Sequence, residues 1–186
     1  MDDYDKFVDF MAGLGVDTSG ASGADLSPTD KRLVDVADFY EEVPAGSHVA
    51  IPSHSTGLGP WHHGIYIGNK RVIHMIGSSK DDAHVQHTCF NDFKRGSSVI
   101  AVVLYADETP LTLERTVSAA HYLKNMLPVQ NLYQILGFNC EHFAVLCKVG
   151  PDRCVPSCDH VRRLLHAPCP PSLLSHGKFT SHGPPL

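Results

Sequence analysis

The sequence predicts an α+β domain in which an antiparallel sheet packs against helices. Short strand-like runs fill residues 47–106, and helical periodicity follows in residues 113–126 and 139–149. Strands followed by helices in this order are typical of the α+β class. The 186 residues, of which 42% are hydrophobic, are enough for one globular domain with a core of its own.

Composition and charge exclude several classes of protein. Lys and Arg number 15 against 20 Asp and Glu, so the formal net charge is −5 and no basic surface for nucleic acid is expected. Residues 1–5 lack the features of a secretory signal, and the apolar run 99–106 is too short for a membrane span, which needs roughly 20 helical residues. We therefore expect a soluble, cytoplasmic protein with six reduced cysteines.

Three segments are predicted along the chain. An N-terminal extension occupies residues 1–42, a folded domain residues 43–150, and a C-terminal tail residues 151–186. The extension is expected to contain a short amphipathic helix, a polar linker and a second helix capped by Ser27-Pro28. The apolar residues of these helices are Tyr4, Phe7, Val8, Met11 and Leu14 in the first, and Leu33, Val36, Ala37 and Tyr40 in the second. The tail is expected to be disordered after a short helix at residues 159–166.

A β-hairpin is the clearest local prediction. The Gly68-Asn69 turn signal separates two strand-like runs, 64–67 and 71–76. His62 and His74 lie about equally far from this turn, so we expect them opposite each other or one residue out of register. Directly opposed Cβ atoms in such a pair are roughly 4.5–5.5 Å apart. The hairpin therefore brings two imidazoles together.

The other elements of the domain follow from the same kinds of pattern. Residues 47–51 are expected to form a short strand, and the apolar run 99–106 a central strand buried on both faces. The intervening segment around His84 and His87 is polar and is not assigned to an element. After Thr109-Pro110, the apolar residues Leu113, Val117, Ala120 and Met126 predict a helix.

Cys140 is the candidate nucleophile. It lies in Gly137-Phe138-Asn139-Cys140-Glu141-His142-Phe143, where a glycine turn leads into a short apolar helix. A thiol in the first turn of a helix faces unpaired N–H groups and the positive end of the helix dipole, both of which favour the thiolate. A base is expected from the histidines around the hairpin, where His62 and His63 point to opposite faces of a strand, so that only one of them faces Cys140.

These motifs resemble a known family. His62-x-Gly64-Ile65-Tyr66-x-Gly68, then Val72-Ile73-His74, and then Asn139-Cys140-Glu141-His142-Phe143 closely resemble the lecithin:retinol acyltransferase-like family, which includes phospholipase/acyltransferases. The resemblance covers residues 44–150. It implies a permuted papain-like fold of the NlpC-peptidase superfamily, in which an antiparallel sheet carries two histidines and a helix carries the cysteine.

The resemblance also implies the chemistry of the site. By position, Cys140 is the acyl-accepting nucleophile, His62 its general base, and His74 the residue that orients this imidazole. The spacing to Gly64-Ile65-Tyr66 favours His62 over His63 as the base. The implied substrates are a glycerophospholipid and an acyl acceptor, either water, an amine such as phosphatidylethanolamine or an alcohol, reached by peripheral membrane contact. No metal and no organic cofactor is required.

Two other functions remain open at this point. The same fold also serves thiol peptidases and amidases, and a similar histidine and Asn-Cys pattern occurs in picornaviral 2A proteins, which suggests a non-catalytic regulatory protein. Structural roles are expected for Glu141, His142 and Tyr66, and a core position for Cys147. Cys154, Cys158 and His160 lie close together in the sequence, but without a Cys-x-x-Cys pair we favour ordinary thiols over a zinc site.

Overall fold

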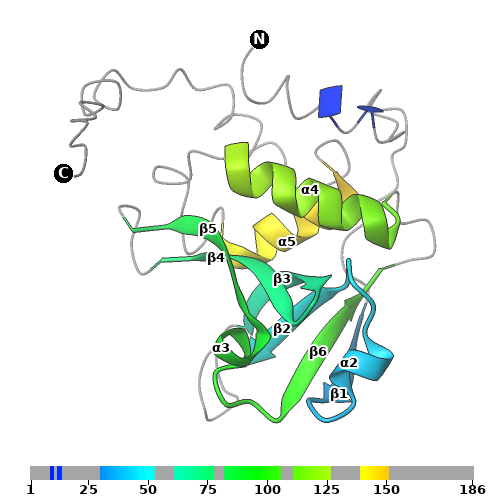
Figure 1. The fold of residues 1–186 in the computed structure, drawn as a ribbon, viewed down its shortest axis with the longest axis vertical. Coiled ribbons are helices and arrows are strands. Elements are labelled where there is room, and N and C mark those ends of the chain that lie inside the picture. Colours follow the sequence, from blue (N-terminus) through cyan, green and yellow to red (C-terminus); the bar gives the residue numbers. More distant parts are fainter. Residues whose placement is uncertain are drawn as a thin grey trace, which may run out of the picture.

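The structure is a computed structural model that describes residues 9–10, 12–13, 30–52, 61–77, 82–105, 111–126 and 139–150. Within these ranges the chain forms a six-stranded antiparallel sheet in the order β1-β6-β2-β3-β4-β5, with helices on both of its faces (Figure 1). The predicted α+β class is confirmed.

The helices and strands have the following bounds. The strands are β1 (Asp30–Asp35), β2 (His48–Pro52), β3 (Trp61–Gly68), β4 (Arg71–Ile76), β5 (His84–Cys89) and β6 (Val99–Leu104). The helices are α2 (Phe39–Glu42), α3 (Phe90–Lys94), α4 (Leu113–Met126) and α5 (Cys140–Val149). The predicted strand at 47–51 and the helices at 113–126 and 139–149 are therefore confirmed.

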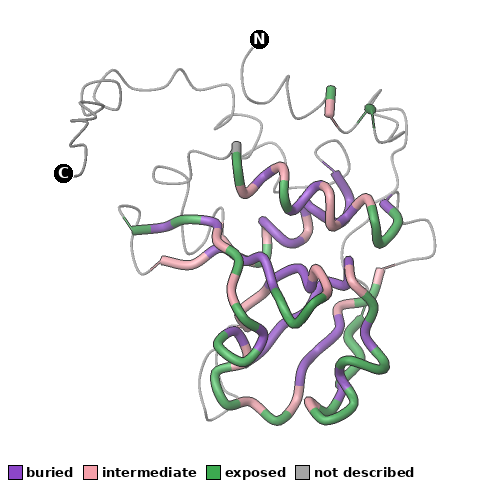
Figure 2. The backbone as a smooth tube through the Cα atoms, in the orientation of Figure 1, coloured by how far each residue is buried: buried purple, intermediate pink, exposed green. Residues whose placement is uncertain are grey.

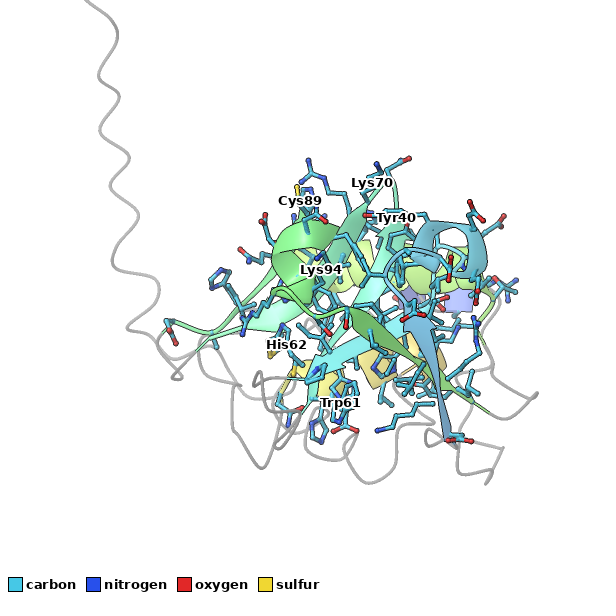
Figure 3. The ribbon with its side chains drawn as sticks, turned by 90° about the horizontal axis from the view of Figure 1, so that it is seen from below. Tyr40, Trp61, His62, Lys70, Cys89 and Lys94 are labelled. Atoms are coloured by element: carbon cyan, nitrogen blue, oxygen red, sulfur yellow. The ribbon has the colours of Figure 1, made fainter. Side chains whose placement is uncertain are left out.

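The β3–β4 hairpin is also confirmed. Asn69 and Lys70 between the strands both have positive φ angles, 48° and 57°, as a two-residue type I′ turn requires. At the far end of the hairpin from His62, Lys70 lies over the ring of Tyr40, with Nζ 5.2 Å from the ring centroid (Figure 3). The register shifts between Tyr66 and Gly68, which changes the residues that face each other further along the strands.

β6 is an internal strand, but it is not at the centre of the sheet. It lies between β1 and β2, and its consecutive residues Ile100, Ala101 and Val102 are buried, as expected for a strand covered on both faces. β2 and β3 are the two middle strands.

The prediction of a second N-terminal helix is wrong. Residues 30–35 form β1, which pairs with β6 from Asp30↔Leu104 to Asp35↔Val99. The 3.6-residue spacing of apolar residues predicted a helix with Leu33 on its buried face, but Leu33 is 59% exposed and Val34 is the buried residue of the strand. β1 satisfies the backbone groups along one edge of β6, a long-range effect that outweighs local helical periodicity. The short helix α2 follows the strand.

β5 is a strand that the sequence pattern did not reveal. It pairs with β4 at the edge of the sheet, from Arg71↔Cys89 to Ile76↔His84. Only Val85 of this strand is buried, and an edge strand of polar residues carries little hydrophobic alternation.

Two hydrophobic cores lie on the two faces of the sheet. On one face, α5 packs against β3 and β4, and α4 covers α5, so that α5 is enclosed on both sides (Figures 1 and 2). Ile65 and Ile73 of the hairpin contribute to this core together with Phe143 of α5. On the other face, Phe39 of α2 and Phe90 of α3 pack against Tyr66, which is buried as predicted.

Gly46 permits a close approach between the turn before β2 and the start of α4, and its replacement should be costly. Its φ angle is +92°, and a Cβ atom there would overlap the backbone of Leu113, with the Leu113 Cα only 2.6 Å away. We expect Gly46→Ala to lower the free energy of unfolding by more than about 2 kcal/mol, because backbone strain and overlap add. Denaturant titration followed by the fluorescence of Trp61 measures this change.

Gly96→Ala is the matched control. Gly96 also has a positive φ angle, +80°, but a Cβ atom there would meet nothing within 4 Å. This variant is expected to lose only about 1 kcal/mol from the left-handed backbone conformation. Equal losses for the two variants would contradict the importance of the contact with Leu113.

Several predictions lie outside the described residues. They concern the linker at 15–27, the helix at 159–166, the tail, and the grouping of Cys154, Cys158 and His160. Of the first predicted helix, residues 9, 10, 12 and 13 are described and are helical, and Phe10 stacks on Tyr122 of α4 with ring centroids 4.1 Å apart. In the described part of the chain, no helix has both the length and the apolar character needed to cross a bilayer.

Candidate active site

The first turn of α5 presents Cys140 as the sequence predicts. Asn139 is the N-cap, with extended backbone angles of φ −135° and ψ −169°. Its side-chain Oδ1 accepts hydrogen bonds from the backbone N–H groups of Glu141 (2.9 Å) and His142 (3.2 Å), and it lies 2.9 Å from His142 Nδ1. Asn139 therefore anchors the turn that holds the thiol, and His142 has the structural contact expected of it.

Removal of this cap should destabilise the domain. We expect Asn139→Ala to lower the free energy of unfolding by about 0.5–2 kcal/mol, because two N–H groups lose their acceptor. Asn139→Asp keeps an acceptor at the same place and adds a negative charge at the helix N-terminus, so it should retain most of the stability. Thermal unfolding of the two variants tests this expectation. An equal loss in both would contradict a capping role.

The sulfur of Cys140 lies beside the first residues of β3, on the side where no pairing with β4 is found among the described residues. The backbone N–H of Tyr66 donates to the Ser47 carbonyl oxygen, and the Tyr66 carbonyl oxygen accepts from the backbone N–H of Gly46. The backbone N–H and C=O groups of even-numbered β3 residues therefore point toward β2. Those of odd-numbered residues therefore face β4. The described β3–β4 pairing spans Ile65↔Ile73 to Gly68↔Arg71 and does not reach the first residues of β3. Beside these first residues, Cys140 Sγ lies 4.0 Å from the Trp61 carbonyl oxygen and interacts with the backbone N–H of His63.

His62 and His74 form a direct pair across the same strands. His62 Nε2 lies 2.8 Å from His74 Nδ1, and the ring centroids are 5.0 Å apart. The predicted register, in which His62 faces His74 directly or is one residue away, was wrong. Ile65 pairs with Ile73, so the residue that faces His74 is Gly64, where a Cβ atom would lie 3.1 Å from the His74 Cβ. The shift near the turn moves His62 to a diagonal position. The missing side chain at Gly64 leaves room for the two rings to meet.

Phe93 of α3 holds this histidine pair in place. Its ring centroid lies 5.5 Å from that of His62 and 5.3 Å from that of His74. His74 is 3% exposed, and its Nε2 is buried without a hydrogen-bond partner among the described residues. The pair is therefore enclosed on the face of the sheet that α2 and α3 cover, and its polar contact is the bond between the two rings.

Burial keeps both imidazoles neutral. It lowers the pKa of His62 to about 4, helped by the charge of Arg95, and the pKa of His74 to about 3, helped by His62 and Arg95. One proton lies between two neutral rings. If His62 is to accept a proton on Nδ1, its Nε2 must donate to His74 Nδ1, and His74 then carries its own proton on Nε2. This arrangement leaves His62 Nδ1 as a free base.

The expected thiolate at Cys140 is not supported. Burial raises the pKa of the Cys140 thiol, and this effect exceeds the opposing contribution of backbone N–H groups from His63, Glu141 and Cys140 itself. The helix N-terminus therefore reduces the cost of the thiolate without reversing the effect of burial. At neutral pH the resting site contains a thiol and neutral imidazoles, and a base is needed to remove the thiol proton.

His63 lies on the opposite face of β3 from His62, as alternation predicts. Its Nδ1 lies 2.8 Å from His48 Nε2, and His48 Nδ1 lies 2.7 Å from the hydroxyl oxygen of Tyr105. This is the face on which Ile65 packs against α5. The sequence pattern offered no signal for this group, because His48 and Tyr105 meet His63 only through the pairing of β2 with β3 and β6.

The remaining candidates have simpler roles. Cys147 is fully buried in the core beneath α5, as predicted, and burial raises the pKa of its thiol. Cys89, Cys140 and Cys147 are the free cysteines of the described part of the chain. Within the same residues, no group of three or more His, Cys, Asp or Glu is arranged to bind a metal ion.

Comparison with known proteins adds one match. The family model described as lecithin retinol acyltransferase matches residues 41–153, which is more than half of the chain and includes every element from β2 to α5. The six-stranded antiparallel sheet with the cysteine helix on one face is consistent with the papain-like fold expected from the sequence resemblance. Among curated proteins, the search finds no significant match.

Proposed function

Because the chain belongs to the lecithin retinol acyltransferase family, we propose that it is a cysteine-dependent acyltransferase with phospholipase A activity. Cys140 takes an acyl chain from a glycerophospholipid as a thioester and passes it to an acceptor. The observation that carries this proposal is the position of the Cys140 sulfur beside the backbone of Trp61 at the start of β3, the strand that also carries the hydrogen-bonded His62.

In the first half of the reaction, His62 acts as general base. Its Nδ1 takes the proton of the Cys140 thiol while the sulfur attacks the ester carbonyl of the lipid. His74 stabilises the protonated ring because its Nδ1 accepts a hydrogen bond from His62 Nε2–H. His62 then gives its proton to the alcohol oxygen of the departing lysophospholipid. The thiol becomes a thioester, and the imidazole returns to its neutral form.

In the second half, an acceptor attacks the thioester. Water yields a free fatty acid, the amine of phosphatidylethanolamine yields an N-acyl lipid, and an alcohol yields an ester. None of these steps needs a metal or an organic cofactor. The substrate class and the role of His62 as base rest on the family, whereas the position of Cys140 in the first turn of α5 also supports its role as nucleophile. We propose that the domain reaches its lipid by peripheral contact with a membrane surface.

The test uses vesicles of phosphatidylcholine with a labelled acyl chain, mixed with unlabelled phosphatidylethanolamine. The wild-type chain is expected to move label into free fatty acid or into the N-acyl lipid, and Cys140→Ala is expected to move none. Cys147→Ala is the matched control, because Cys147 lies on the same helix but in the core. Activity that persists in Cys140→Ala would overturn the proposal. Cleavage of peptide amides without any lipid turnover would instead assign a peptidase.

A further inference from the structure

A second chain of hydrogen-bonded side chains crosses the sheet on the α5 face. It runs from His63 of β3 through His48 of β2 to Tyr105, the residue after β6, with nitrogen–nitrogen and nitrogen–oxygen distances of 2.8 and 2.7 Å. His48 in the middle is only 1% exposed. Nothing in the first half of the proposed reaction uses these residues. Three polar groups from three segments, buried and mutually bonded, need an explanation.

These three side chains are arranged as an oriented general base is. When Tyr105 accepts from His48 Nδ1, His48 Nε2 is free to accept from His63 Nδ1, and the lone pair of His63 then lies on Nε2. A residue that accepts from one nitrogen of an imidazole and leaves the other nitrogen free is the arrangement that general bases use. The reverse direction, with the Tyr105 hydroxyl as donor, places a proton on His63 Nε2. The three hydrogen-bonded side chains are therefore able to hold His63 in either of its neutral tautomers.

The residue that carries this base contacts the nucleophile through its backbone. The backbone N–H of His63 interacts with the Cys140 sulfur, and α5 packs on the face to which the His63 side chain points. His62 and His63 thus project from opposite faces of the strand segment whose backbone contacts the sulfur. The His63 side chain lies on the α5 face of the sheet, whereas the His62–His74 pair lies on the side of α3.

The surroundings keep the His63 and His48 rings neutral at physiological pH. Burial lowers the pKa of His63 to about 4 and that of His48 well below its ordinary value. The charged and titratable groups that act on the two rings are Lys31 of β1, His62 of β3, and His142 and Lys148 of α5. All of them oppose a further positive charge, so the resting His63 is unprotonated and able to accept a proton.

We infer that His63, positioned by His48 and Tyr105, is a second base that takes the proton of the acyl acceptor. The inference rests on the proposed function. The O–H or N–H proton of the acceptor moves to His63 Nε2 as the acceptor bonds to the acyl carbon. The C–S bond breaks, and its electron pair remains on the Cys140 sulfur. The proton then passes from His63 to the thiolate, which restores the thiol and the neutral ring.

The test separates formation of the acyl-enzyme from its breakdown. The full chain is mixed with phosphatidylcholine that has a labelled acyl chain, and the thioester on Cys140 is followed by rapid quench. His63→Gln is expected to form the thioester at the wild-type rate and to lose it at least ~10-fold more slowly. Tyr105→Phe, which removes one oxygen atom, should slow breakdown in the same direction but by less. It provides the same test if His63→Gln does not fold.

Each outcome is decisive. Breakdown at the wild-type rate in both variants, or formation and breakdown slowed in parallel together with a lower melting temperature, would overturn the inference and leave His63 with a structural role. In both cases the wild-type thioester still forms, so the proposed function stands. A wild-type chain that forms no thioester would overturn the proposed function and this inference with it.

Discussion

Replacing His62 with alanine is expected to slow acylation of Cys140 by about 10²–10⁴-fold. Burial raises the pKa of the Cys140 thiol, so the nucleophile is protonated before substrate binds and depends on a base. His62 is the histidine whose Nε2 is bonded to His74, and its Nδ1 has no hydrogen bond to the described residues. Single-turnover formation of the thioester measures this step directly.

Two other histidines serve as comparisons for this experiment. His74→Ala should slow acylation by less than His62→Ala, because His74 acts only through the other ring. His121→Ala should leave it unchanged, since His121 is an exposed residue of α4. The assignment fails if His62→Ala acylates normally and His63→Gln does not. That result would make His63, on the α5 face, the base for the thiol.

Acid should destabilise the domain strongly between pH 7 and pH 5. Four histidines of the β-sheet, His48, His62, His63 and His74, have a pKa that burial lowers from the ordinary 6.5, in three of them to about 3 or 4, and burial also lowers the pKa of His121 on α4. In this interval the unfolded chain binds more protons than the folded one, so stability rises with pH and is lost as pH falls. Each such histidine contributes at most about 1.4 kcal/mol per pH unit, so a loss of several kcal/mol is expected.

Denaturant titrations at pH 7.5, 6 and 5 measure this loss. Trp61, the single tryptophan, lies in β3 beside the histidines and reports unfolding by its fluorescence. His48→Gln removes a buried titrating group and should flatten the dependence on pH more than His121→Ala, because His121 is exposed whereas the pKa of His48 is lowered well below its ordinary value. An unfolding free energy that stays constant down to pH 5 would show that these imidazoles are protonated in the folded state, contrary to their burial.

Elements defined by local residues are predictable from this sequence. The hairpin follows from its two-residue turn, and α5 from the cap at Asn139 and the apolar residues behind it. β1 and β5 are not predictable in this way, because each is held at an edge of the sheet by a partner distant in the chain. The helical stripe through Leu33 has no packed face in the fold, since that residue is largely exposed.

The candidate site shows the same division between local and distant effects. Cys140, His62 and His74 are marked by motifs, and the two histidines meet, although through a register that the spacing did not predict. The raised pKa of the thiol depends on how deeply α5 packs against β3, which no local pattern encodes. His48 and Tyr105 are invisible to motif analysis because the sheet brings them to His63 from distant segments.

The central claim is that Cys140 carries an acyl chain from a phospholipid. We would incubate the purified chain with phosphatidylcholine, quench the reaction in acid and measure the intact mass. The account predicts an adduct of one acyl group that hydroxylamine removes, that maps to Cys140, and that is absent from Cys140→Ala. A folded wild-type chain that acquires no such adduct, and releases no fatty acid, would contradict the account.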